Sequence, residues 1–90
     1  MAQFYDYKFQ FHNVGERSLN FEPSDEDTAG DVKYFGFLSY SGSWLIMKMD
    51  TTIPTAIVYR YIAGNSGYAV YWAGKADLTY VTYDQITALL

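Results

Sequence analysis

The chain has 90 residues, a net charge of −4 and no cysteine, and 20% of its residues are aromatic. A chain of this length forms one small domain with a marginal core, so oligomerisation or docking would add to its stability. The lack of cysteine excludes disulfides and thiolate sites, and the negative balance argues against direct binding to nucleic-acid phosphates. Since no apolar run approaches about 18 residues and no basic-then-apolar leader is present, we expect neither a membrane span nor Sec-type export.

Residues 4–12 alternate between aromatic and polar side chains, which predicts a strand with one wet face. The only histidine, His12, lies on the polar face. No serine or carboxylate forms a recognisable nucleophile motif with it, so we interpret it as a surface or interface imidazole and expect no enzyme activity. The aromatic face consists of Tyr5, Tyr7, Phe9 and Phe11.

Residues 15–31 contain six acidic side chains, one arginine and few apolar groups. This composition predicts an extended acidic connector. We therefore divide the chain into an N-terminal arm, residues 1–31, and a compact β domain, residues 32–90. The strand of the arm could pair with the open sheet edge of a neighbouring subunit.

The acidic run also resembles the start of a calcium-binding loop. Asp25, Asp27 and Gly30 stand at positions 1, 3 and 6 of an EF-hand pattern. Position 12 is Gly36, however, and no bidentate glutamate closes the site. We expect neither a metal nor a cofactor.

The most apolar stretch, residues 32–50, predicts a hairpin that turns at Ser41-Gly42. Both faces of this hairpin would be apolar, so we expect burial on both sides, inside a small barrel or sandwich or against another subunit. Gly36 predicts a bulge or a close approach of another group to the backbone. With a two-residue loop, the cross-strand pairs are Tyr40 with Ser43, Leu38 with Leu45, Gly36 with Met47, Phe37 with Ile46 and Ser39 with Trp44.

The rest of the chain reads as short elements joined by turns. Thr82 and Gln85 have the spacing of a capping box, and Ile86, Leu89 and Leu90 then form an apolar stripe. The predicted elements are a strand over residues 55–62, a turn over 64–67, one or two helical turns over 68–73 that start at Ser66, a strand over 78–81 and a C-terminal helical turn.

Three aromatic side chains, Tyr68, Tyr71 and Trp72, fall on one face of the predicted helical turns. They could form a platform for a sugar ring or a base. The alternative, which we favour, is that these rings complete the core around Trp44.

An ordered series of aromatic, glycine and turn residues runs from Tyr34 onward. It consists of Tyr34 to Leu38, Gly42, Trp44 to Met47, Tyr59 to Tyr61, Gly64 to Ser66, Tyr68 with Trp72, and Leu78 to Tyr80. This order resembles small structural proteins of tailed bacteriophages. The resemblance covers about 50 residues and implies a virion component, such as a capsid decoration or tail protein, without choosing between them.

The sequence therefore predicts a mainly β, barrel- or sandwich-like domain with an extended N-terminal arm and a short C-terminal helical turn. We expect a non-enzymatic virion subunit, assembled in the host cytoplasm, that binds other coat or tail subunits and forms homo-oligomers. A glycan-binding module of a tail fibre, which would use Tyr68, Tyr71 and Trp72, is the alternative. The expected partner-binding residues are Tyr5, Tyr7, Phe9, Phe11, Glu22, Asp25, Glu26 and Asp27, with the acids on a basic surface of the partner.

Overall fold

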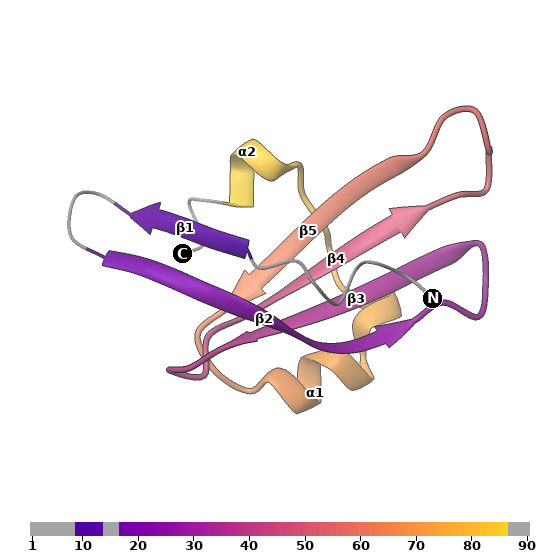
Figure 1. Ribbon diagram of the computed structural model, residues 1–90. Coiled ribbons are helices and arrows are strands. Elements are labelled where there is room, and N and C mark those ends of the chain that lie inside the picture. Colours follow the sequence, from indigo (N-terminus) through magenta and orange to yellow (C-terminus); the bar gives the residue numbers. More distant parts are fainter. Residues whose placement is uncertain (1–8, 14–16, 87–90) are drawn as a thin grey trace.

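The computed structural model describes residues 9–13 and 17–86, with side chains from residue 21 onward. Its described part is mainly β, as the sequence predicted, and forms one antiparallel sheet in the order β1-β2-β3-β4-β5 (Figure 1). The elements are β1 (Phe9–Asn13), β2 (Arg17–Asp27), β3 (Val32–Ser39), β4 (Trp44–Asp50), β5 (Val58–Gly64), α1 (Tyr68–Ala73), the 3-10 helix η2 (Lys75–Asp77) and α2 (Tyr83–Ile86).

The sheet is not closed, and this corrects the barrel- or sandwich-like expectation. Among the described residues β1 and β5 are the two edges, and they do not pair with each other. After β5 the chain forms short helices instead of further strands that could close or double the sheet. The predicted strand over residues 78–81 is reduced to one bridge, in which Val81 exchanges two backbone hydrogen bonds with Tyr61.

The prediction of an acidic connector is wrong for residues 17–27, which form β2, an interior strand of the sheet. β2 pairs with β1 on one side and with β3 on the other. Its register against β3 shifts between Pro23 and Asp25, so a bulge absorbs Ser24 beside the proline, whose missing N–H is best tolerated there. For Gly36 the sequence predicted a bulge or a close approach to the backbone; the bulge lies on the partner strand, and the close approach is made by Tyr68 and Trp72.

The β3–β4 hairpin is confirmed, but its predicted register is wrong by one residue. The loop has three residues, since the Ser39 N–H donates to the Ser43 carbonyl at 2.8 Å across Tyr40, Ser41 and Gly42. Gly42 has a φ of 96°, the left-handed conformation that closes a three-residue hairpin loop. The observed pairs are Leu38 with Trp44, Phe37 with Leu45, Gly36 with Ile46 and Phe35 with Met47.

Both faces of this hairpin are buried, as predicted. On one face a core forms beneath α2, whose Ile86 is fully buried. On the other face α1 covers Gly36 and Trp44. The core cluster consists of Phe21, Phe35, Phe37, Leu45, Met47 and Ile86.

The helical turns over residues 68–73 are confirmed as α1, with a different start from the one predicted. The residue before the helix is Gly67, at a φ of 76°, and no side chain caps the helix. Thr82 bonds to Gln85 at the start of α2, and Ile86 fills the core. Leu89 and Leu90 lie outside the described residues.

Candidate functional site

The aromatic side chains of α1 pack against the sheet and against each other. Tyr71 stacks on Trp44 with a centroid distance of 4.9 Å, and Tyr68 stacks on Trp72 at 6.0 Å. The Trp44 ring N–H donates to the Ser66 carbonyl at 2.7 Å, which ties the β5–α1 turn to the sheet. Tyr68 and Tyr71 thus both pack on Trp44, and Trp72 packs on Tyr68, in agreement with the packing interpretation.

Gly36 makes this close packing possible. A Cβ at this position would collide with the Tyr68 hydroxyl and come within 3.0 Å of the Trp72 ring. The same hydroxyl donates to Asp25 Oδ2 at 2.8 Å across the neighbouring strand. Burial, followed by this hydrogen bond, raises the pKa of Tyr68.

Lys75 extends the aromatic layer and joins it to β2. Its ammonium lies 4.5 Å from the centre of the Trp72 ring, 5.8 Å from that of Tyr34, and 3.3 Å from Asp27 Oδ2. The Lys75 side chain is only 17% exposed, so the contact with Asp27 is partly desolvated. The Tyr80 hydroxyl donates to the Lys75 carbonyl, and burial raises the pKa of Tyr80.

The four predicted acidic contact residues lie on β2, but they are not equivalent. Asp25 and Asp27 are engaged within the chain, by Tyr68 and Lys75. Glu26 lies opposite Phe35, and its buried Oε2 has no hydrogen-bond partner among the described residues. Glu22 is exposed. Of the predicted aromatic arm, Phe9 and Phe11 belong to β1, which pairs with the chain's own β2, while Tyr5 and Tyr7 lie outside the described residues.

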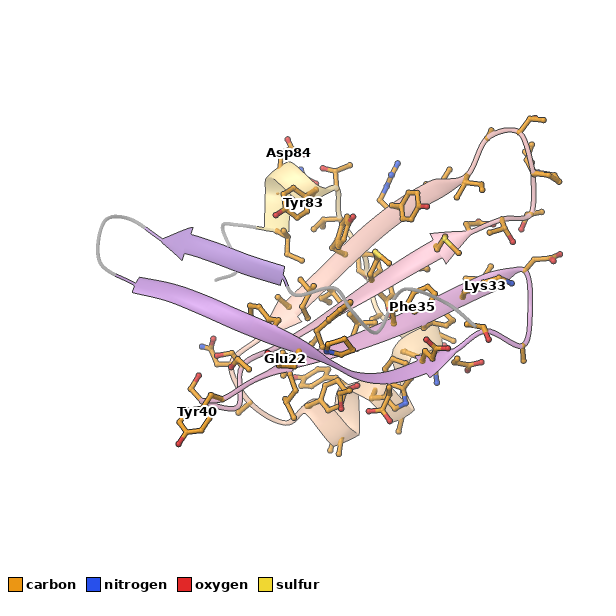
Figure 2. All side chains as sticks on the ribbon, viewed as in Figure 1. Glu22, Lys33, Phe35, Tyr40, Tyr83 and Asp84 are labelled. Atoms are coloured by element: carbon orange, nitrogen blue, oxygen red, sulfur yellow. The ribbon has the colours of Figure 1, made fainter. Side chains whose placement is uncertain are left out.

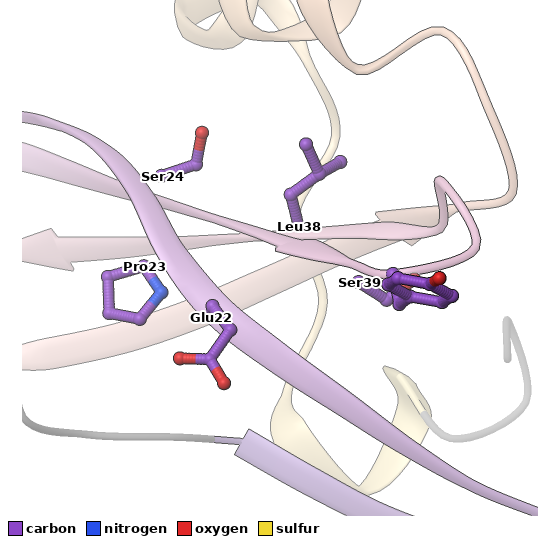
Figure 3. Close-up of a pocket in the computed structure, with 6 residues that line it drawn as sticks. Glu22, Pro23, Ser24, Leu38 and Ser39 are labelled. Carbon is purple, nitrogen blue, oxygen red and sulfur yellow. The ribbon is translucent and has the colours of Figure 1, made fainter.

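A shallow, open hollow of about 410 Å³ lies between β2 and the end of β3 (Figure 3). Glu22 is the only charged residue of its lining. Tyr40, at the tip of the β3–β4 turn, is fully exposed (Figure 2). The lining contains no histidine or cysteine and consists of Glu22, Pro23, Ser24, Leu38, Ser39 and Tyr40.

The outer end of β5 exposes several large apolar side chains. Ile57, the residue before β5, is 44% exposed, and Val58 and Tyr59, the first two residues of this edge strand, are 40% and 45% exposed. Tyr83 of α2, labelled in Figure 2, packs edge-on against Tyr61 at 5.2 Å. Burial, with smaller effects from Tyr83 and Tyr59, raises the pKa of Tyr61, so the three tyrosines form one cluster beside the edge.

The backbone of β5 is covered over part of its length. Tyr61 exchanges hydrogen bonds with Val81 on the outer side of the strand, at 2.7 and 2.8 Å. Because bonding directions alternate along a strand, the N–H and C=O of Tyr59 point to the same side. The Tyr59 carbonyl accepts a bond from Arg60 Nη1 at 2.8 Å, and its N–H has no partner among the described residues. We call Ile57, Val58, Tyr59 and Arg60 the β5 edge.

The described residues contain no cluster of three or more side chains that could hold a metal ion. Within the same part of the chain, no helix has the length and hydropathy to cross a membrane. Comparison of the chain with protein-family models, with curated proteins and with solved structures gave no significant match.

Sequence reasoning predicted a strand over residues 55–62 but did not single out its exposed end as a contact surface. Alternation predicts that a segment is extended, but the position of a strand at an edge follows from the pairing of all the strands. The run Ile57-Val58-Tyr59 next to Arg60 was the available signal, since apolar strand residues beside a charge are typical of protected sheet edges.

Proposed function

We propose that this chain is a non-enzymatic structural subunit of a bacteriophage particle, a capsid decoration or cement protein or another assembly subunit, which attaches to neighbouring subunits through the β5 edge. The tyrosine cluster of Tyr59, Tyr61 and Tyr83 adds an aromatic surface beside that edge. The location in a phage particle rests on the sequence resemblance, and the mode of attachment rests on the structure.

The observation that carries this proposal is the exposure of Ile57, just before β5, and of Val58 and Tyr59 at its start, next to a Tyr59 N–H that has no partner among the described residues. Single exposed apolar residues are common on protein surfaces and need no explanation. Here three follow one another at the outer end of an edge strand, and an exposed apolar edge invites pairing with another chain. A partner strand would bury these side chains and satisfy the backbone in one contact.

No specific contact favours the glycan-binding alternative. Tyr68 and Trp72 are half-buried and stack on each other, and Tyr71 stacks on Trp44. Attachment through Tyr5, Tyr7, Phe9 and Phe11 stays a prediction, as do homo-oligomers and the contact of the acidic residues with a basic partner.

The test is mass analysis of purified particles that carry the wild-type chain or single variants. We expect the wild-type chain in stoichiometric amount: hundreds of copies identify a shell component, and six to a few dozen identify a tail or neck component. Tyr59→Ser should fold and yet be lost from the particles. Val70→Ser is the matched control, since Val70 is 74% exposed on α1, away from the β5 edge. Absence of the wild-type chain, or normal incorporation of Tyr59→Ser, would refute the proposal.

A further inference from the structure

Two cations lie opposite each other beside the β5 edge. The register of β4 against β5 pairs Lys48 with Arg60. Like charges directly opposite on neighbouring strands are destabilising, and neither cation forms an ion pair with a described residue. The Lys48 ammonium lies 4.7 Å from the centre of the Tyr80 ring, and the Arg60 guanidinium bonds to the Tyr59 carbonyl. An acid lies beside them on the same face: Asp50 lies opposite Val58, and hydrogen bonds from Thr52 and, less strongly, the Lys48 charge lower its pKa. Lys48, Arg60 and Asp50 together carry a charge of +1, in a chain with a net charge of −4.

We propose that the β5 edge binds an extended, acidic segment of a partner protein, which pairs with the backbone at Tyr59 while its carboxylates contact Arg60 and Lys48. This inference rests on the proposed function and specifies the partner. The occupant is a strand because the edge offers backbone groups at the spacing of a strand. It is acidic because carboxylates would neutralise the Lys48–Arg60 pair.

The apolar residues of the edge fit the same occupant. In a strand, side chains alternate between the two faces of the sheet, so Tyr59 lies on one face of β5 and Val58 and Arg60 share the other, while Ile57 precedes the strand. A bound segment with acidic residues on the face of Arg60 and apolar residues on the face of Tyr59 would match this arrangement. When it binds, the Tyr59 carbonyl accepts a backbone N–H and Arg60 is released to a carboxylate, which forms a stronger, charge-assisted bond.

A simpler interpretation is that Arg60 only protects the edge strand against aggregation. Charged side chains on edge strands are a common protection against aggregation. That role predicts self-association when Arg60 is removed and no preference for acidic partners. It does not account for Lys48, which lies one strand further in and does not reach the edge backbone in this structure.

The experiment is an NMR titration of the ¹⁵N-labelled full chain with three synthetic peptides of equal length. The first alternates Glu and Val, the second alternates Lys and Val, and the third is the acidic peptide with proline at its central position. We expect the acidic peptide to shift the amides of the β5 edge saturably and to slow hydrogen exchange of the Tyr59 N–H. The Lys peptide and the proline peptide should each bind at least about tenfold more weakly.

Charge reversal provides the matched control. The double variant Lys48→Glu/Arg60→Glu should prefer the Lys peptide, and Arg60→Glu alone should weaken binding of the acidic peptide at least about fivefold. Lys33→Glu should leave binding unchanged, because Lys33 lies on β3, away from the edge, and bonds to the Gly30 carbonyl. Equal binding of the acidic and Lys peptides, shifts confined to other strands, or no binding at all would overturn the inference. So would β5 shifts that depend only on protein concentration, because they would identify a second copy of the chain as the occupant.

The same variants separate this inference from the proposed function. If particles incorporate Lys48→Glu/Arg60→Glu normally and exclude Tyr59→Ser, the acidic partner is refuted and attachment through the β5 edge stands. If particles incorporate Tyr59→Ser normally, the proposed function is refuted whatever the peptides show.

Discussion

Replacement of Gly36 by alanine tests whether α1 docks on the sheet through this glycine. The new Cβ would collide with the Tyr68 hydroxyl and lie 2.9 Å from the ring carbon that carries it. Tyr68 cannot simply move aside, because Trp44 and Trp72 pack around it and its hydroxyl bonds to Asp25. The helix must therefore shift or the hydrogen bond must break.

The expected loss of stability follows from these contacts. Overpacking in a tight site costs about 1–3 kcal/mol, and loss of the Tyr68–Asp25 bond adds about 0.5–1.5 kcal/mol, since the Asp25 carboxylate is exposed. The lower chain entropy of alanine in the unfolded state offsets about 0.4–1 kcal/mol. We expect Gly36→Ala to lower the free energy of unfolding by about 2 kcal/mol, which is roughly 8–16 °C in Tm for a domain of this size.

The assay is urea denaturation followed by tryptophan fluorescence, with Gly30→Ala as the control. Gly30 has no atom within 4 Å of a new Cβ, so its replacement should change stability by less than about 0.5 kcal/mol. A double-mutant cycle with Tyr68→Phe, which removes the colliding hydroxyl, should show a coupling of about 1 kcal/mol or more. Additive effects, or a Gly36→Ala variant as stable as Gly30→Ala, would refute the proposed role of Gly36.

Three further predictions concern the core, the aromatic layer and the tyrosines. Leu45→Ala should lower the free energy of unfolding by about 2–5 kcal/mol, because Leu45 is fully buried, whereas Val70→Ala on the exposed face of α1 should change it by less than about 0.5 kcal/mol. Lys75→Met should lower the free energy of unfolding by about 0.5–1 kcal/mol. If the Asp27 contact is responsible, this difference from wild type should shrink in 1 M salt. Lys33→Met is the control for the loss of one positive charge. Burial raises the pKa values of Tyr68 and Tyr80 above the unfolded value of about 10, so the folded state favours their neutral forms. The free energy of unfolding should therefore be retained below about pH 10 and fall as the pH rises above it. Urea denaturation between about pH 8 and 11 tests this, and a dependence that is equally steep in Tyr80→Phe would contradict the role of Tyr80.

The sequence was sufficient for those parts of the fold that one short stretch determines. Two apolar faces in residues 32–50 predicted burial on both sides, and the spacing of Tyr68, Tyr71 and Trp72 predicted α1. Both signals come from side chains close together in the chain, so they do not depend on the position of any other element.

The acidic strand shows why local composition can mislead. Residues 17–27 contain too many acids to resemble a sheet strand, but the carboxylates of Asp25 and Asp27 are bonded by Tyr68 and Lys75, which lie more than 40 residues further along the chain. Nothing within the segment reveals these partners. The alternation of Leu19 and Phe21 with polar neighbours was the available signal, and it was too short to outweigh the acids.

The register of the hairpin and the pairing of Lys48 with Arg60 depend on backbone geometry that composition does not determine. The Ser41-Gly42 dipeptide fits a two-residue loop or the end of a three-residue loop, and these differ by one residue in every cross-strand pair. The pairing of Lys48 with Arg60 depends in turn on the register of β4 against β5. The β5 edge and its two cations could therefore be identified only once the pairing of all the strands was known.

The sequence and the structure also give different reasons to expect assembly with other subunits. A hairpin with two apolar faces needs cover, and from the sequence alone a neighbouring subunit was a natural source of it. The structure finds that cover within the chain, from α1 on one face and from Ile86 on the other. Burial of the hairpin is therefore a requirement for folding and does not by itself call for a partner.

The β5 edge is different, because Ile57, Val58 and Tyr59 stay 40–45% exposed and no described residue pairs with the Tyr59 N–H. The two requirements can thus be separated by mutation. Substitutions at Gly36 and Leu45 should reduce stability, and they should reduce attachment only as far as the chain unfolds. Substitutions at Tyr59 and Arg60 should reduce attachment while the free energy of unfolding stays within about 0.5 kcal/mol of wild type, as is usual for exposed positions. If Tyr59→Ser instead unfolds the chain, the outer end of β5 is part of the core and not a contact surface.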